Sequence, residues 1–401
     1  MSASPGRQRT LLLFGAGNIG LSFVAPLFAG AGYRVVIADV EPRVLGRLRR
    51  HDFFRVESIS PDGSRTITEV SPSGIVDARD RAAIAEVLSA GSKPPIVATA
   101  VGSRAFPTVL RTLRDALPDE LPMSAIDIVA AENIHDPASV AQQTLERDLP
   151  AVHACAVGKM VPVQDLAGSA DQNDEPIEVR AEAFNTLYVD GRRWAGRPPS
   201  DLTDLVLVDD IEAWMNRKLY IHNLGHSACA WIARAIDPSL KTISEAVGSP
   251  GIAEFTDLVM TAGVEVVAAA HPSLFTRDEL LIHAKELLHR FSSVALGDTV
   301  ERVGRDVNRK LARDDRVVGC MLLAARHQPA ALPVLADVYA TALRFGVAGL
   351  AENENDRLVT ASGISPADAA IRISGLDPGK SAEERAVLDA LAVARPNGVA
   401  G

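Results

Sequence analysis

Short apolar runs alternate with helix-like segments in the first half of the chain, and these runs have the length and composition of buried strands. They span residues 11–14, 33–38, 95–102 and 125–130, with weaker alternation at 151–162 and 177–190. The 3.6-residue period of helices recurs between them, at 82–88 and 106–117. Strands that alternate with helices are typical of a parallel sheet covered on both faces. The first half is therefore predicted to be a doubly wound α/β domain.

The second half changes character after residues 196–200, which read Gly-Arg-Pro-Pro-Ser and are the best linker candidate. From residue 204 onward the apolar period is almost wholly helical. The predicted helical segments are 204–235, 251–270, 276–295, 298–326, 331–345, 366–373 and 381–393. Because 401 residues exceed one typical core, we predict two domains, 1–197 and 198–401.

A glycine-rich turn directly follows the first predicted strand, where residues 15–20 read Gly-Ala-Gly-Asn-Ile-Gly. In such a turn the first glycine permits a tight bend, the second lets the backbone approach a pyrophosphate, and the third allows the helix to pack closely on the strand. The helix N-terminus adds unpaired N–H groups. The fold class predicted is an α/β N-terminal Rossmann-type domain followed by a mostly α-helical C-terminal domain. The residues expected to contact a dinucleotide are Gly15, Gly17, Asn18, Ile19 and Gly20.

An acidic residue, Asp39, ends the second predicted strand at about 20 residues beyond the last glycine, the spacing of a ribose-binding carboxylate. A carboxylate accepts hydrogen bonds from the ribose hydroxyls and repels a 2′-phosphate. NAD is therefore preferred over NADP as the cofactor. The strand at 95–102 ends in a turn of small residues, and Thr99 and Val101 are expected to lie beside this cofactor.

An amine, an amide and an imidazole lie within nine residues of an otherwise apolar stretch, as Lys218, Asn223 and His226. On a regular helix they fall within roughly 140° of arc and can face one cavity. An apolar surrounding should lower the pKa of Lys218 toward the range in which it accepts a proton near neutral pH. Asn223 and His226 would then bond an oxygen whose charge changes. The alternative is that Lys218 extends to solvent and His226 is structural.

A further amide, Asn133, follows the strand at 125–130, and ligands of open α/β sheets gather at the carboxyl ends of strands. Asn133 is therefore a candidate catalytic residue. It can equally be the N-cap of the next helix.

Four cations lie close together in the helical half, and they are Arg302, Arg305, Arg309 and Lys310. On a continuous helix the three arginines fall within roughly 60° of arc. Such a stripe could hold a phosphate or carboxylate through forked hydrogen bonds. The alternative is a solvated face in which neighbouring acidic residues pair with these cations.

Composition limits the possible partners and compartments. The formal net charge of −10 argues against a nucleic-acid surface. Cys155, Cys229 and Cys320 are few and far apart, so neither a disulfide framework nor a cysteine-rich metal site is expected, and a cytoplasmic location fits. The apolar stretch 11–31 imitates a signal peptide but is better explained as the glycine turn and its helix. No membrane span is expected.

Together these motifs resemble the polyol-specific long-chain dehydrogenase/reductase (mannitol dehydrogenase) family. Within it they are more similar to the mannitol-1-phosphate 5-dehydrogenase branch than to the mannitol 2-dehydrogenase branch. The spacing K-x-x-x-x-N-x-x-H from Lys218 is specific to the family, whereas the glycine turn is not. The segments that carry the resemblance are FGAGNIG (14–20), ADV (38–40), TAVG (99–102), AEN (131–133), EPIEV (175–179), RKLYIHNLGH (217–226), DTVERVG (298–304) and ISGLD (373–377).

The resemblance implies a metal-independent, NAD-dependent oxidation of a secondary alcohol, with mannitol 1-phosphate and fructose 6-phosphate as the expected pair. It implies that Lys218 is the general base, that Asn223 and Asn133 bind the developing alkoxide, and that His226 orients the substrate oxygen. Positions matching Arg302 and Lys310 hold substrate in the family. The extra basicity of Arg305 and Arg309 resembles the phosphate-using branch.

Two departures leave the substrate open. Gly158 stands where the family often has an aspartate, and Leu21 stands where an arginine commonly follows the glycine turn. An unphosphorylated polyol or a hexuronate is therefore the alternative substrate. A nucleotide-binding sensor without turnover is a further alternative, against which the complete Lys, Asn and His set argues. The sequence leaves the oligomeric state undecided and is compatible with a monomer.

Overall fold

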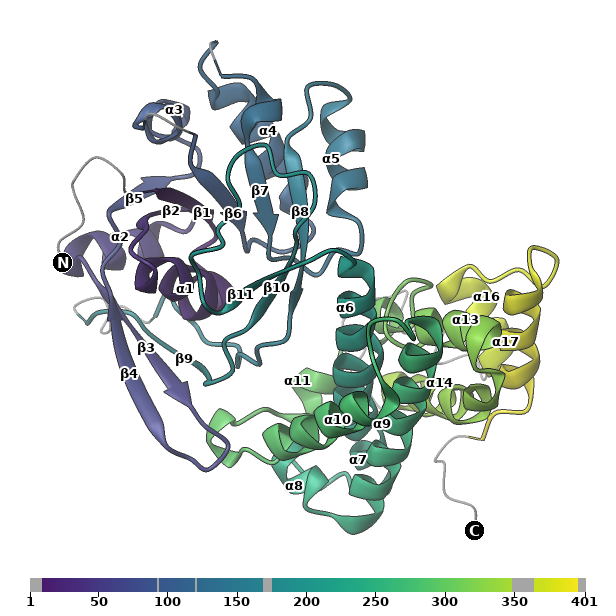
Figure 1. Cartoon of the computed structure of the whole chain (residues 1–401). Helices are drawn as coiled ribbons and strands as arrows, with labels where there is room; N and C mark the ends of the chain where they lie inside the picture. Colours follow the sequence, from purple (N-terminus) through teal and green to yellow (C-terminus); the bar gives the residue numbers. More distant parts are fainter. Residues whose placement is uncertain (1–8, 92–93, 120, 169–174, 348–363, 396–401) are drawn as a thin grey trace. The chain divides into compact units, whose positions relative to one another are not determined.

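The computed structural model describes residues 9–91, 94–119, 121–168, 175–347 and 364–395 (Figure 1). It divides into two compact units, Met1–Glu212 and Ala213–Gly401. This boundary lies beyond the expected one after Arg197, because the strand Leu205–Val208 pairs with Leu187–Asp190 and so belongs to the first unit.

The first unit is built on an eight-stranded sheet with the order β11-β10-β8-β7-β6-β1-β2-β5. All neighbouring strands are parallel except β8 and β10, which are antiparallel. The strands are β1 (Thr10–Phe14), β2 (Arg34–Asp39), β5 (Gly74–Asp77), β6 (Ile96–Thr99), β7 (Asp127–Ala130), β8 (Ala151–Val157), β10 (Leu187–Asp190) and β11 (Leu205–Val208).

Helices cover both faces of this sheet (Figure 1). Because successive side chains of a strand point to opposite faces, Leu11 and Leu13 join one apolar cluster and Leu12 and Phe14 join another. The first cluster includes residues of α1 (Ala25–Gly30) and α2 (Pro42–His51), and the second includes residues of α3 (Arg81–Ser89), α4 (Phe106–Ala116) and α5 (Pro137–Leu145). A strand that is apolar on both faces is typical of a covered parallel sheet. The predicted doubly wound fold is confirmed.

A second, three-stranded sheet has the order β4-β3-β9, with the strands β3 (Phe54–Ile59), β4 (Arg65–Val70) and β9 (Glu178–Glu182). The sequence pattern did not predict β3 and β4, and it treated 177–190 as one strand, whereas β9 and β10 belong to different sheets. The residues of β4 before Val70 are exposed on both faces. They therefore lack the apolar alternation on which a strand prediction depends.

The second unit is helical, as predicted. Its helices are α6 (Ile211–Arg217, which crosses the boundary), α7 (Leu224–Ile236), α8 (Ile243–Val247), α9 (Pro250–Ala270), α10 (Arg277–Phe291), α11 (Val300–Gly304), α12 (Val307–Lys310), α13 (Val318–His327), α14 (Leu332–Val347), α16 (Pro366–Ser374) and α17 (Ala382–Ala392). Among the described residues, no helix is long and apolar enough to span a membrane.

Two of the predicted helical segments were wrong in part. Residues 298–326 form three separate helices. Asp306, in the left-handed conformation with φ of 58°, lies between α11 and α12, and residues 311–317 separate α12 from α13. Residues 204–235 begin with the strand β11, and the helix starts only at Ile211.

A π-helical turn, η4 (Lys218–Asn223), joins α6 to α7. Two glycines on neighbouring helices pack against Tyr220 in this turn. A Cβ atom on Gly263 of α9 would overlap the Tyr220 carbonyl oxygen, and one on Gly319 of α13 would lie 2.7 Å from the Tyr220 hydroxyl oxygen. The turn is therefore enclosed by two helices that approach it through glycine.

Candidate functional site

The glycine turn after β1 satisfies the steric requirements of a close backbone approach. Gly15 has φ of 107°, and a Cβ atom there would overlap the carbonyl oxygen of Ala100. A Cβ atom on Gly20 would overlap the Gly15 carbonyl oxygen, so the helix can pack on the turn only through glycine. At Gly17, by contrast, no heavy atom lies within 4 Å of the Cβ position. The second glycine therefore borders open space, as a site for a pyrophosphate requires.

Asp39, at the end of β2, stabilises this turn through hydrogen bonds to backbone N–H groups. Its Oδ2 accepts a hydrogen bond from the Ala16 N–H (2.5 Å), and its Oδ1 accepts from the N–H groups of Val40 (2.7 Å) and Glu41 (2.9 Å). Because an ionised carboxylate offers about four acceptor positions, one remains for a ribose hydroxyl. Asp39 thus has a structural role that the sequence did not reveal, beside the proposed ribose contact.

The turn after β6 is held by a buried carboxylate, Glu132, for which the sequence pattern predicted no role. Its Oε1 accepts from the Val101 N–H and its Oε2 from the Gly102 N–H, both at 2.8 Å. Burial raises the pKa of Glu132, and these hydrogen bonds offset part of the shift. Thr99, fully buried, precedes this turn. Glu132 lies two residues after the end of β7, and this position at the carboxyl end of a strand was the available sequence signal.

Asn133 follows Glu132 and is exposed. The helix after it, α5, is capped by Asp136, whose carboxylate accepts from the Ser139 N–H at 2.9 Å. The alternative reading of Asn133 as the N-cap of this helix is therefore wrong. Asn133 lies at the carboxyl end of β7, where a ligand of this sheet would lie.

The second unit carries the amine, amide and imidazole on η4 and α7. Lys218 and Asn223 are the first and last residues of the π-helical turn, and His226 lies in the first turn of α7. All three side chains are half-buried. The predicted arc of 140° assumed a regular helix, which is wrong here because a π-helical turn has i→i+5 hydrogen bonds. π-helical turns occur frequently at functional sites.

His226 lies between an aromatic ring and a carboxylate. Its imidazole stacks on Phe291 with 4.6 Å between ring centroids, and its Nε2 lies 3.2 Å from Oδ2 of Asp298. Arg302 donates to Oδ1 of the same carboxylate through Nε at 2.6 Å and also through Nη2. Burial alone would raise the pKa of Asp298, but His226 and Arg302 outweigh it and lower this pKa. Arg302 is therefore fixed beside His226.

Two histidines, His222 on η4 and His283 on α10, have lowered pKa values. His222, one residue before Asn223, has its pKa lowered well below the usual value, first by burial and then by the charges of Arg290, His226, His283 and Lys218. The pKa of His283 is lowered to about 3, again first by burial, then by Arg217 and Arg290. Both imidazoles are therefore neutral near neutral pH.

The predicted basic stripe does not form as expected. The break at Asp306 places Arg302 and Arg309 on different helices, so the shared arc of 60° is wrong. Arg309 is exposed and pairs with Asp306 and Asp315, each at 3.3 Å. Arg305 is exposed and has no ion-pair partner within the described part of the chain.

Lys310 is buried rather than exposed beside the arginines, with 4% of its surface accessible. Its Nζ donates to the carbonyl oxygens of Val303 (2.5 Å) and Arg305. Burial, followed by the charges of Arg316 and Arg309, lowers the pKa of Lys310 to about 6. Its visible role is to bind the carbonyl groups at the end of α11.

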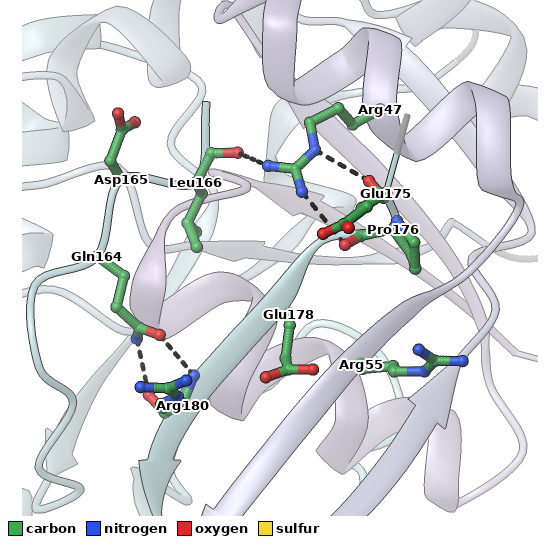
Figure 2. Close-up of a pocket in the computed structure, with 9 residues that line it drawn as sticks. All are labelled: Arg47, Arg55, Gln164, Asp165, Leu166, Glu175, Pro176, Glu178 and Arg180. Atoms are coloured by element: carbon green, nitrogen blue, oxygen red, sulfur yellow. Dashed lines mark hydrogen bonds between the residues drawn. The ribbon is translucent and has the colours of Figure 1, made fainter. Parts of the chain in front are cut away.

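One cavity of about 570 Å³ in the first unit lies apart from all predicted site residues (Figure 2). The Arg47 guanidinium in its wall donates to the carbonyl oxygens of Leu166 (2.9 Å), Glu175 (3.2 Å) and Pro176 (3.2 Å). Arg47 therefore holds two chain segments together. Among the residues that the structure describes, no group of three His, Cys, Asp or Glu could hold a metal ion.

Comparison with protein families gives two matches. The description "Mannitol dehydrogenase Rossmann domain" matches residues 9–201, and "Mannitol dehydrogenase C-terminal domain" matches residues 210–356. The chain is 31% identical over 376 residues to the mannitol-1-phosphate 5-dehydrogenase of Pseudarthrobacter chlorophenolicus, covering 91% of this chain and 92% of the relative. It is 27% identical over 349 residues to the protein of the same name from Bacillus subtilis, covering 84% and 88%.

Two solved structures resemble the chain along almost its whole length. Mannitol 2-dehydrogenase from Pseudomonas fluorescens, solved as a ternary complex with NAD and D-mannitol, gives a TM-score of 0.71 at 14% identity, covering 96% of this chain and 91% of that chain. A substrate-free D-sorbitol dehydrogenase gives 0.69 at 15% identity, covering 96% and 92%. At these identities the likeness shows the fold alone.

The buried amine of Lys310 should make stability depend on pH. Since its pKa is about 6 in the folded chain, against 10.5 for an unperturbed lysine, the unfolded chain binds more protons between these values, and stability rises with pH across that window. We expect the free energy of unfolding of wild type, relative to Lys310→Met, to rise by up to about 1.4 kcal/mol per pH unit from neutral pH upward. Urea denaturation at several pH values measures it.

Lys285→Met is the control, because Lys285 is exposed on α10. This variant should follow the wild-type pH dependence. If the free energy of unfolding depended on pH in the same way in wild type and Lys310→Met, Lys310 would keep its proton when the chain folds.

Proposed function

Since this chain belongs to the mannitol dehydrogenase family, we propose that it interconverts mannitol 1-phosphate and fructose 6-phosphate with NAD as the cofactor. Membership confirms the resemblance read from the sequence and makes the chain an oxidoreductase with polyol dehydrogenase chemistry. The observation that carries the choice of substrate is the similarity to mannitol-1-phosphate 5-dehydrogenases over about nine-tenths of the chain.

The proton transfer is assigned to Lys218. In its neutral form the amine removes the proton of the substrate hydroxyl, and in the reverse direction the ammonium returns it. The bound cofactor supplies the hydride acceptor. The half-buried position of Lys218 and the nearby cation Arg290, which lowers the pKa of the adjacent His222, support this proposal, because both disfavour a further positive charge in this region. This base makes a metal unnecessary for the proposed step.

Three side chains are proposed to act on the substrate oxygen. Asn223 follows Lys218 on the same π-helical turn and donates a hydrogen bond to the developing alkoxide, and Asn133 of the first unit donates another. His226 orients the same oxygen. Because Nε2 of His226 already faces Asp298, Nδ1 is the nitrogen assigned to the substrate.

The glycine turn and Asp39 are proposed to hold NAD. The open space at Gly17 fits the approach of a pyrophosphate, and the remaining acceptor position of Asp39 fits a ribose hydroxyl. Asn18, Ile19 and Val101, which are partly exposed, complete the proposed contacts, whereas the expected contact of Thr99 is not kept, because this residue is fully buried at the end of β6. A carboxylate at Asp39 disfavours the additional phosphate of NADP through charge repulsion.

The phosphate is assigned chiefly to Arg305. Arg302, Arg309 and Lys310 already bond carboxylate or carbonyl oxygens of the chain, whereas Arg305 remains exposed. Engagement of three of the four cations also favours the second candidate, an unphosphorylated polyol. The choice between the two substrates therefore rests on kinetic comparison.

Removal of the Lys218 amine tests the mechanism. Lys218→Ala should lower kcat for mannitol 1-phosphate oxidation by on the order of 10² to 10⁴, the usual contribution of a positioned base, and should leave NADH binding intact. Steady-state NADH absorbance and a fluorescence titration measure the two quantities. Lys285→Ala, which removes an exposed amine, should behave as wild type. Near-normal turnover in Lys218→Ala would remove this residue from the mechanism.

Removal of the Arg305 guanidinium tests the substrate. Arg305→Ala should raise KM for mannitol 1-phosphate by about 10- to 100-fold with little change in kcat, because it removes binding that ground state and transition state share. Activity on mannitol should not change. Arg372→Ala, at an exposed arginine on α16, is the control. Equal kcat/KM for mannitol and its phosphate in wild type would favour the unphosphorylated substrate.

Replacement of the Asp39 carboxylate tests the cofactor. Asp39→Ser should shift the ratio of kcat/KM for NAD to that for NADP by about 10-fold or more toward NADP, the size of a lost charge repulsion of roughly 1.4 kcal/mol. The ratio is the suitable measure because Asp39 also holds the glycine turn through Ala16. Asp77→Ser, on the neighbouring strand β5 in register with Asp39, should leave the ratio unchanged. A wild type that prefers NADP would refute the assignment.

A further inference from the structure

A buried arginine, Arg316, bonds to the end of the π-helical turn that carries Lys218 and Asn223. It has 8% of its surface accessible and precedes α13 in the chain. Its Nη1 donates to the Asn223 carbonyl oxygen (3.4 Å) and to Oγ of Ser227 (3.1 Å). The guanidinium therefore reaches both the last residue of η4 and the first turn of α7.

The acceptors of Arg316 fix its orientation. Nε donates to Oδ1 of Asp315 at 2.8 Å, and the backbone N–H of Arg316 donates to the same oxygen at 2.7 Å. A second arginine, Arg309, bonds the other oxygen of Asp315. The planar guanidinium thus has charge-assisted hydrogen bonds on one side and the π-helical turn on the other.

The remaining sides of the turn are packed by backbone and aromatic atoms. Gly263 lies against the Tyr220 carbonyl group and Gly319 against the Tyr220 hydroxyl group. These contacts exclude side chains but make no directed bond to Asn223. A π-helical turn interrupts the regular i→i+4 ladder, so a donor from outside the helix is a directed restraint on the carbonyl it reaches.

We propose that Arg316 is a positioning residue, which holds the Asn223 carbonyl group and thereby sets the direction of the Asn223 and Lys218 side chains. The inference rests on the proposed function, in which these two side chains meet the substrate oxygen. Arg316 itself contacts no reacting atom in this proposal. Its loss leaves the Asn223 carbonyl oxygen without this donor and the partly buried Asp315 carboxylate without its closest cation.

The test compares full-length wild type with Arg316→Ala and Arg316→Lys in mannitol 1-phosphate oxidation. We expect kcat to fall by on the order of 10- to 100-fold in both variants, with the KM for NAD unchanged, because the loss is confined to the transition state. Arg316→Lys retains the positive charge but lacks the planar guanidinium group that bonds Asp315 and Asn223 at the same time. Methylguanidinium should restore much of the activity of Arg316→Ala and none of that of Arg316→Lys, whose side chain fills the space.

Acylation of the Lys218 amine by acetic anhydride, followed by peptide mass spectrometry, provides a measurement independent of turnover. The rate near neutral pH should fall in both Arg316 variants and recover with methylguanidinium in Arg316→Ala. Arg313→Ala is the control, because Arg313 pairs with the buried Glu384 at 2.6 Å in the same unit. This control loses an ion pair but should retain wild-type kcat per folded molecule and the wild-type acylation rate.

Wild-type kcat and acylation in Arg316→Lys would overturn the inference, since charge alone would then suffice. So would an activity loss in Arg316→Ala that matches only the fraction of unfolded protein and is not restored by methylguanidinium. If wild type oxidises no polyol phosphate, the proposed function fails, and the acylation rate alone decides. An unchanged rate then overturns the positioning role, and a slowed rate that methylguanidinium restores supports it.

Discussion

The packing around the π-helical turn Lys218–Asn223 is the constraint on which the proposed chemistry depends. Two glycines allow α9 and α13 to approach Tyr220 more closely than any residue with a Cβ atom would permit. Arg316 adds a directed bond at the end of the turn. The turn that carries Lys218 and Asn223 is therefore packed by α9 and by the segment 316–319. Helix propensity alone favours the regular α-helix at this point.

Much of the first unit was predictable because its signals are local. Leu11–Phe14 is apolar on both faces, the glycine turn follows at once, and Asp39 ends the next strand at the expected spacing. Each feature is encoded within a few neighbouring residues. Two hydrogen bonds were not predictable: the Asp39 carboxylate accepts from the Ala16 N–H, and the Glu132 carboxylate accepts from the Val101 N–H. A carboxylate that binds backbone N–H groups has no periodic sequence pattern.

In the second unit, one helix break, the burial of Lys310 and the π-helical turn were not predicted from the sequence. Residues 298–326 have helical periodicity, yet Asp306 takes a left-handed conformation that no local pattern indicates. Beyond this break Lys310 is buried and donates to the carbonyl groups of Val303 and Arg305. The π-helical turn was also missed, and the glycines that pack against it, Gly263 and Gly319, lie far along the chain. Residue types at the candidate site could be predicted, but their exposure and partners could not.

Carboxylates of the second unit form ion pairs with several of its arginines and so fix their orientation. Asp298 holds Arg302 beside His226, and Asp315 holds both Arg309 and Arg316. A guanidinium fixed by a carboxylate has less charge to offer a ligand, but it is oriented firmly enough to position its neighbours. The chain as a whole carries a net charge of −10, so an anionic substrate would have to be attracted by a local field. In the proposed arrangement the paired arginines orient the side chains of the site, and the exposed Arg305 is the arginine proposed to bind the anion.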